Sequence, residues 1–121
     1  MNLDRKRLGE EGEARAADYL VRQGLTLLEK NFKTQFAEID LIAREGDWIC
    51  FVEVKTRSSL GKGIPAEAVT RSKQQKIILA AQYFLKKKKM ANPRFRFDVV
   101  DVRFIDNKWQ IRHIPHAFQA G

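Results

Sequence analysis

Two carboxylates in this sequence are spaced so that they could share one divalent metal ion. Asp40 and Glu53 each lie in a stretch of alternating apolar and polar residues, and Gly46-Asp47 between the stretches is typical of a tight turn. If these two residues form the whole loop, Asp40 lies directly opposite Glu53 in an antiparallel pair. Opposed side chains in such a pair have Cβ atoms about 4.5–5.5 Å apart. The two carboxylates would then be close enough to bind the same cation.

The chemistry that this pair predicts is metal-assisted attack on a phosphate. Like charges directly opposite each other destabilise a sheet, so fold stability gives no reason to place Asp40 opposite Glu53. Binding of Mg²⁺ would be a reason for this placement, because Mg²⁺ is often held by one or two carboxylates together with water and substrate phosphate. Lys55 follows Glu53 by two residues and shares its strand face. Its ammonium could stabilise charge that develops on the phosphate.

An exposed polar strand face is the alternative explanation of the same residues. Glu38 would then form an ordinary cross-strand ion pair with Lys55, while Asp40 and Glu53 would lie in water at modest cost. The register separates the two interpretations, because a loop one residue longer would place Asp40 and Glu53 on opposite faces. The spacing alone leaves both interpretations open.

The elements that would position these residues begin with a helix. Asp4 is a candidate N-cap, and Gly24 follows the end of a stretch with apolar residues at helical spacing. Three strands are expected next, over residues 25–33, 36–45 and 48–56. The second and third strands carry the candidate catalytic residues.

The second half of the sequence predicts one more helix and two more strands. A loop with glycine and proline at 61–65 precedes a short helical turn at 66–69 and a helix over 72–89. Strands are then expected over 95–104 and 109–114. The order is therefore α-β-β-β-α-β(-β). We expect an α/β fold in which a meander of three strands is joined by a helical crossover to a parallel fourth strand, giving a mixed sheet flanked by helices.

The length of 121 residues fits a single domain over residues 1–121, and no repeat or linker divides the chain. The formal net charge is +8. Residues 55–96 contain 12 Lys and Arg and one acid, a local net charge of +11, so the remainder has a net charge of −3. Such a basic segment is typical of a polyanion-binding surface. A basic surface that is merely solvated has the same composition.

Several classes of protein do not fit the composition. The longest apolar stretches, such as residues 48–52, are far shorter than the ~20 residues of a membrane span, and the N-terminus lacks an apolar signal-peptide core. We therefore expect a cytoplasmic protein that does not enter the membrane. The single Cys50 excludes an internal disulfide and reads as a buried small residue. His113 and His116 flank Pro115, which argues against a zinc site.

Seven short stretches together resemble the PD-(D/E)XK nuclease superfamily, and in particular the UPF0102 (YraN-like) family, which is related to archaeal Holliday-junction resolvases. The stretches are Gly12-Glu13, Asn31-Phe32, Glu38 to Ile42, Phe51 to Arg57, Ala68-Val69, Ser72 to Gln74 and Phe97 to Val100. The resemblance covers nearly the whole chain. It implies a restriction-endonuclease-like fold, which agrees with the order of elements read from the residues.

The resemblance also implies roles for individual residues. Asp40, Glu53 and Lys55 match the catalytic motif, and Asp40 and Glu53 would hold Mg²⁺ or Mn²⁺. Glu13 matches an acidic residue that the first helix often adds to the metal site, although its position alone favours a solvated helix face. One departure is visible, since Ala37 stands where the family usually has glycine.

Four further residues are candidates for contact with nucleic acid. Lys73 and Gln74 match polar positions at the start of the second helix, where related nucleases place a residue facing the phosphate. Arg57 ends a matching stretch, and Lys76 lies one helical turn beyond Lys73. For the lysines, plain solvation is an equally good explanation.

The sequence therefore predicts a metal-dependent nuclease that hydrolyses phosphodiester bonds in DNA, with branched or junction DNA among its candidate substrates. The alternative is a non-catalytic nucleic-acid-binding module with the nuclease-like fold, accessory to DNA processing. A third hypothesis is a basic face that binds RNA or another protein. The likeness to junction resolvases suggests a homodimer, since a two-fold junction suits a two-fold enzyme.

Overall fold

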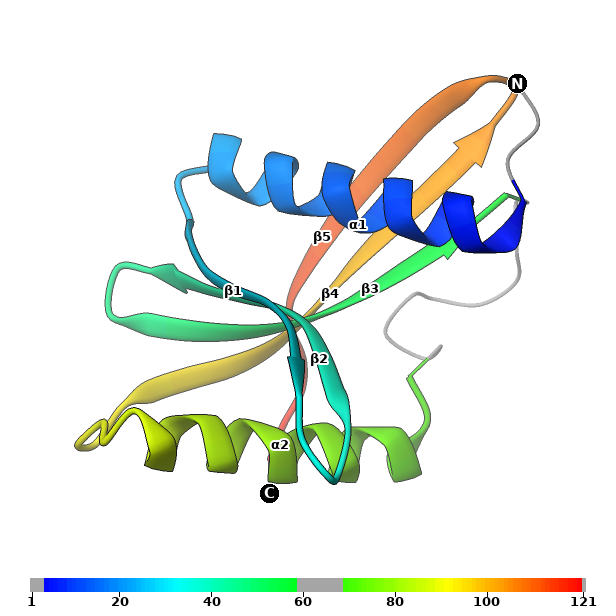
Figure 1. Ribbon diagram of the computed structural model, residues 1–121. Helices are drawn as coiled ribbons and strands as arrows, with labels where there is room; N and C mark the ends of the chain where they lie inside the picture. Colours follow the sequence, from blue (N-terminus) through cyan, green and yellow to red (C-terminus); the bar gives the residue numbers. More distant parts are fainter. Residues whose placement is uncertain (1–3, 59–68, 121) are drawn as a thin grey trace.

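The computed structural model describes residues 4–58 and 69–120, which form two helices and one five-stranded sheet (Figure 1). The elements are α1 (Arg5–Arg22), β1 (Thr26–Lys33), β2 (Glu38–Glu45), β3 (Trp48–Arg57), α2 (Arg71–Lys87), β4 (Arg94–Ile105) and β5 (Lys108–Phe118). This order confirms the predicted α/β class. The loop expected at 61–65 and the helical turn expected at 66–69, apart from its last residue, lie outside the described residues.

The sheet is mixed, as predicted, and its strands lie in the order β1-β2-β3-β4-β5. β1, β2 and β3 form an antiparallel meander, β3 and β4 run parallel, and β5 returns antiparallel to β4. Parallel neighbours need a crossover connection, and α2 lies in the one between β3 and β4. Figure 1 shows α1 and α2 on opposite sides of the sheet.

Each helix covers its own hydrophobic cluster. On the side of α2, the ring of Phe51 contacts those of Phe84 and Phe97, with centroids 5.8 Å and 5.7 Å apart. On the side of α1, Leu20 packs in a cluster with Val52. β3 and β4 are therefore buried on both faces, which explains their long apolar runs.

Side-chain caps fix where both helices begin. The Asp4 carboxylate accepts a hydrogen bond from the backbone N–H of Arg7 at 2.8 Å, as its prediction as an N-cap implies. Thr70 caps α2 by accepting from the backbone N–H of Lys73 at 3.2 Å. The second helix thus covers 71–87 instead of the expected 72–89. Neither helix in the described ranges has the length and apolar character needed to cross a membrane.

α1 lies unusually close to β3 at Gly12. A Cβ atom on this buried glycine would fall 2.6 Å from Cγ2 and 2.9 Å from Cβ of Thr56, and closer still to the Thr56 hydroxyl oxygen. Rotation of the Thr56 side chain cannot move its own Cβ, so the helix or the strand would have to shift. Glycine at position 12 therefore sets the distance between α1 and the sheet.

We expect Gly12→Ala to lower the free energy of unfolding by about 1–3 kcal/mol, because overpacking forces backbone shifts. Gly9→Ala is the matched control, since Gly9 lies in the same helix with nothing within 4 Å of its added Cβ. Alanine there should stabilise the chain by roughly 0.5–1 kcal/mol. Urea unfolding of both variants measures the difference, and equal effects would contradict a close helix–strand contact.

Candidate active site

The β2–β3 hairpin places the two predicted carboxylates at neighbouring positions. Its ladder runs from a turn of two residues at 46 and 47 to the pair Leu41–Val52. This is the register predicted from the sequence. Asp40 and Glu53 are the next residues on the two strands, just beyond the last pair.

The sheet divides at this point. β2 stays paired with β1 as far as Glu38, and β3 stays paired with β4 as far as Arg57, while the ladder between β2 and β3 has already ended. The Asp40 carboxylate takes the place of a ladder partner, because its Oδ2 accepts a hydrogen bond from the backbone N–H of Val54 at 2.8 Å. One polar side chain thus closes the hairpin where the backbones separate.

Asn31 connects the dividing point to α1. It lies between Lys30 and Phe32, whose partners Leu41 and Ile39 flank Asp40. Its φ of 51° is left-handed, a conformation that asparagine adopts more readily than most residues. Its side-chain Nδ2 donates to Oε1 of Glu13 at 2.9 Å. Sequence reasoning gave Asn31 no role, although a polar asparagine inside a strand was a usable signal for a local break.

Glu53 is held by a cation of α2. Its side chain is 9% exposed, and its Oε1 lies 2.8 Å from Nζ of Lys73, whose side chain is 52% exposed. Lys73 lies in the first turn of α2. The ion pair therefore joins the end of the hairpin to the start of the crossover helix.

The environment of Asp40 strongly disfavours its charged form. Burial is the largest cause, and the negative charge of Glu53 acts in the same direction. The hydrogen bond from the Val54 N–H opposes both, while the charge of Glu13 adds a smaller contribution. Together they raise the pKa of Asp40 to about 8. Asp40 thus holds its proton at a pH where an ordinary aspartate has lost it.

Asp40 and Glu53 both line one open pocket of about 490 Å³. The remaining described residues that line it are Phe36, Ala37, Glu38, Thr70, Ser72, Lys73 and Lys76. Glu13 lines a different pocket, of about 290 Å³, together with Lys30 and Asn31. The predicted residues Asp40, Glu53, Lys73 and Lys76 are thereby brought to one surface.

Lys55 and Arg57 lie outside this pocket. Lys55 is half-buried on β3 and is paired in register with Asp101 of β4. Arg57 is only 17% exposed, and its Nη2 lies 3.0 Å from Oδ1 of the buried Asp101. Arg103 approaches the other oxygen of Asp101 at 3.0 Å. Arg57 was predicted to contact nucleic acid, and here its guanidinium is paired with a buried carboxylate.

Gln74 supports the backbone at the start of α2. Its Nε2 donates to the carbonyl oxygen of Val69 at 2.9 Å, so the amide does not face the pocket in the way that the resemblance implied. The cross-strand ion pair considered between Glu38 and Lys55 is also absent from the described part of the chain, in which both residues lie.

The donor set fits a hard divalent ion that keeps part of its water. Mg²⁺ accepts one or two protein carboxylates when substrate phosphate and water complete its shell, and Asp40 and Glu53 supply two. Within residues 4–58 and 69–120, no group of three or more His, Cys, Asp or Glu side chains is arranged to hold a metal ion. Glu13 instead remains bonded to Asn31.

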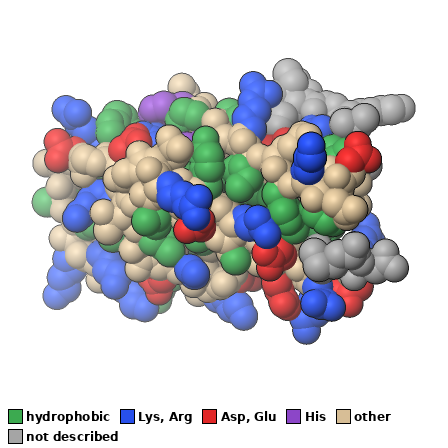
Figure 2. Space-filling model, turned by 90° about the horizontal axis from the view of Figure 1, so that it is seen from above, with side chains coloured by type: hydrophobic (Ala, Val, Ile, Leu, Met, Phe, Trp, Pro, Cys, Tyr) green, Lys and Arg blue, Asp and Glu red, His purple; other side chains and the backbone are tan. Residues whose placement is uncertain are grey.

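The two sides of the molecule differ in charge. Viewed from above, from the side of α1, cationic and acidic side chains are interspersed over the surface (Figure 2). α2, on the opposite side, has five Lys and Arg and no acid in its 17 residues. The part of the basic segment that the structure describes in α2 is thus adjacent to the carboxylate pocket, through Lys73 and Lys76.

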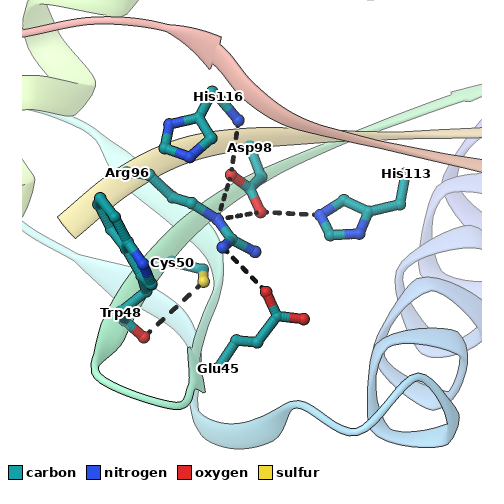
Figure 3. Close-up of polar contacts among 7 residues, drawn as sticks. All are labelled: Glu45, Trp48, Cys50, Arg96, Asp98, His113 and His116. Atoms are coloured by element: carbon teal, nitrogen blue, oxygen red, sulfur yellow. Dashed lines mark hydrogen bonds and ion pairs between the residues drawn. The ribbon is translucent and has the colours of Figure 1, made fainter. Parts of the chain in front are cut away.

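A second polar cluster joins residues of β2, β4 and β5 (Figure 3). Asp98 is fully buried, and Nε of Arg96 donates to its two oxygens at 3.0 and 3.1 Å. Nε2 of His113 lies 2.7 Å from Oδ2, and the backbone N–H of His116 donates to Oδ1 at 3.1 Å. The Arg96 guanidinium also contacts Glu45 at 2.9 Å. Both carboxylate oxygens of Asp98 therefore have partners within the fold, which gives this residue a structural role.

This cluster explains two features of the C-terminal strand. β5 extends to Phe118, beyond the predicted end at 114, although it contains Pro115. The register shifts between Phe97 and Val99, and His116 has a φ of 52°, which turns its N–H inward to Asp98. Burial also raises the pKa of the adjacent Cys50 thiol to about 12, so this cysteine is an unreactive core residue, as expected.

Comparison with known proteins places these features in a family. Residues 12–102 match the uncharacterised protein family UPF0102. A UPF0102 protein of Desulforapulum autotrophicum is 44% identical over 99% of both chains, and one of Geobacter metallireducens is 45% identical over 100% of this chain and 99% of its own. A third, from Rhodococcus opacus, is 47% identical over 92% of this chain and 95% of its own.

We expect Asp40→Asn to stabilise the chain at alkaline pH. The pKa of Asp40 in the folded chain lies above its ordinary value of 3.8, so the folded state binds more protons than the unfolded state between about pH 4 and 8. The stability that the protonated group contributes is complete below pH 4 and is lost as pH rises through 8. Urea midpoints should therefore favour the variant at pH 9 and converge near pH 4, whereas a constant difference would contradict the raised pKa.

We expect Asp98→Ala to lower the free energy of unfolding by about 3–5 kcal/mol, because it leaves Arg96 buried without its main partner. Asp18→Ala is the matched control, since Asp18 makes an exposed ion pair with Arg22. Removing a surface pair should cost no more than about 1 kcal/mol. Chemical denaturation of the two variants compares them, and similar losses would exclude a structural role for the cluster.

Proposed function

The chain belongs to the UPF0102 family, and we propose that it is a metal-dependent nuclease that hydrolyses phosphodiester bonds in DNA. The observation that carries the proposal is the juxtaposition of Asp40 and Glu53 where β2 and β3 separate. Two neighbouring buried carboxylates cannot both be charged without a cost in stability, and a bound cation would remove that cost. The resemblance of the surrounding motifs to PD-(D/E)XK nucleases supports the same assignment.

In this proposal Asp40 and Glu53 hold Mg²⁺ or Mn²⁺, with Glu13 as a further acid on α1. A bound ion would polarise the scissile phosphate and lower the pKa of a coordinated water. Asp40 must release its proton before it can act as a ligand. The backbone N–H of Val54 then stabilises the charged carboxylate and keeps it oriented.

The lysines of the pocket are suited to the substrate rather than to the metal. Lys73 neutralises Glu53 in the free protein, and its half-exposed side chain can turn toward a phosphate once a metal ion takes its place. Lys76 lies one helical turn further along and lines the same pocket. Lys55 does not line this pocket, so its proposed role, stabilising the charge that develops on the phosphate during hydrolysis, rests on the resemblance of its motif alone.

A second candidate is a nucleic-acid-binding module that has the same fold but does not cleave. Two observations favour it: Lys73 already neutralises Glu53, and the described residues offer no cluster of three acids. Such a module would bind DNA in a salt-dependent manner through its basic helix. It would not bind divalent metal at Asp40 and Glu53.

Cleavage assays with purified protein and Mn²⁺ separate the two candidates. Linear, flapped and four-way-junction DNA should be cut by the wild type, and Asp40→Ala and Glu53→Ala should each cut at least about a hundredfold more slowly while still binding DNA, because a Lewis-acid metal contributes several kcal/mol. Asp18→Ala removes an exposed acid of α1 and should cut normally. Equal cutting by the wild type and both site variants would contradict the nuclease proposal. Absence of both cutting and calorimetric metal binding would favour the binding module.

A further inference from the structure

An aromatic groove adjoins the carboxylate pocket. It has a volume of about 470 Å³ and is lined by Lys33, Thr34, Gln35, Phe36 and Tyr83. Phe36 is 37% exposed and Tyr83 is 49% exposed, values that are high for rings of this size. Figure 1 shows the short connection between β1 and β2 reaching toward α2, which carries Tyr83.

Hydrogen bonds of Thr34 close the turn that carries Phe36. The Thr34 hydroxyl accepts hydrogen bonds from the backbone N–H groups of Phe36 and Ala37 at 3.0 and 3.1 Å, and the Thr34 N–H donates to the Ala37 carbonyl at 3.0 Å. Phe36 is thus held at the tip of a closed turn while part of its ring stays in contact with water. A preorganised exposed ring loses little conformational entropy when it binds a partner.

Tyr83 is half-exposed and contacts the core through Phe32. Its ring meets Phe32 with centroids 6.2 Å apart, whereas its neighbour Phe84 turns into the core. Tyr83 also lines the groove. Neither exposed ring is needed to fill the hydrophobic clusters, so their positions call for another explanation.

Phe36 lies between the two hollows. It lines both the pocket of Asp40 and Glu53 and the aromatic groove. A nucleic-acid strand with one phosphate at Asp40 and Glu53 would therefore place its next nucleotide over Phe36. This continuity sets the direction in which an elongated ligand would run.

The charges around the groove suit a polyanion. Lys33 lines the groove itself, Lys76 lines the adjoining pocket, and Nζ of Lys87 lies 5.9 Å from the centroid of the Phe32 ring. None of the described residues that line the groove is acidic. A second copy of the chain is a poorer occupant, because a two-fold contact through this surface would bring the same cations face to face.

We propose that Phe36 and Tyr83 form a binding site for unpaired bases of a nucleic acid, which stack on the two rings while lysines contact the phosphates. The bases of a duplex already stack on each other, so only a single-stranded segment can use both rings. This inference rests on the proposed function only for the direction in which the nucleic-acid strand runs, toward Asp40. The stacking site then specifies the substrate class: DNA with a single-stranded segment, as in a flap, fork or gap.

Binding without metal tests this site apart from cleavage. Fluorescence anisotropy in the presence of a chelator would compare a labelled single strand of mixed sequence with a duplex of the same sequence. Phe36→Ala and Tyr83→Ala should each bind the single strand about tenfold more weakly, with duplex affinity unchanged, because stacking on one ring contributes that much. Tyr83→Phe should bind as the wild type does, since it keeps the ring.

Two controls keep the result interpretable. Val21→Ala shortens another exposed apolar side chain, 50% exposed on α1, and should leave both affinities unchanged. Phe36→Leu keeps apolar bulk without an aromatic face, and should weaken single-strand binding as Phe36→Ala does. Full affinity in Phe36→Leu, or an equal loss for single strand and duplex in the alanine variants, would overturn the inference.

Self-association is the competing outcome. If sedimentation shows a wild-type dimer that Phe36→Ala and Tyr83→Ala convert to monomers, a second copy covers the groove and the inference is wrong. Failure of the nuclease proposal would be recognised differently, by cutting that survives Asp40→Ala and Glu53→Ala. Selective loss of single-strand affinity would still support the stacking site in that case.

Discussion

The separation of β2 from β3 is the constraint on which the site depends. Backbone groups that lose their ladder partner must find another when they are buried, and here the Asp40 carboxylate bonds to the N–H of Val54. In this position the Asp40 carboxylate lies next to Glu53, and its burial there together with the charge of Glu53 raises the pKa of Asp40. The separation of the strands also leaves the open pocket between the two halves of the sheet, into which the first turn of α2 directs Lys73.

The elements and the hairpin register could be predicted because they follow from local patterns. Alternation along both strands and a two-residue turn were enough to place Asp40 beside Glu53. Lys55 shows where that reasoning stops. The alternation of side chains along β3 places Lys55 on the same strand face as Glu53. It does not reveal that β2 and β3 have separated at this point, or that lysines of α2 line the pocket instead of Lys55. A break in pairing depends on contacts between distant segments, which no single window of sequence contains.

Long-range partners also account for the other differences. Arg57 pairs with Asp101, 44 residues further along the chain, and a buried aspartate in a strand of valines gives no local indication of its partner. Gln74 bonds to the backbone of Val69, because the start of α2 has donors and acceptors to satisfy. The extension of β5 past Pro115 depends on Asp98, which holds the irregular backbone at His116. Charge and alternation show which residues are polar, whereas tertiary structure decides which of them are already paired.

The irregular end of β5 has a consequence for how this molecule meets others. β5 is an outer strand of the sheet, and such strands can recruit a strand from a neighbouring chain through unpaired backbone groups. Pro115 has no N–H to offer, and the N–H of His116 points inward to Asp98. The last third of this edge is therefore a poor template for strand addition. A network that balances buried charge within the fold thus also makes this part of the edge less open to strand addition.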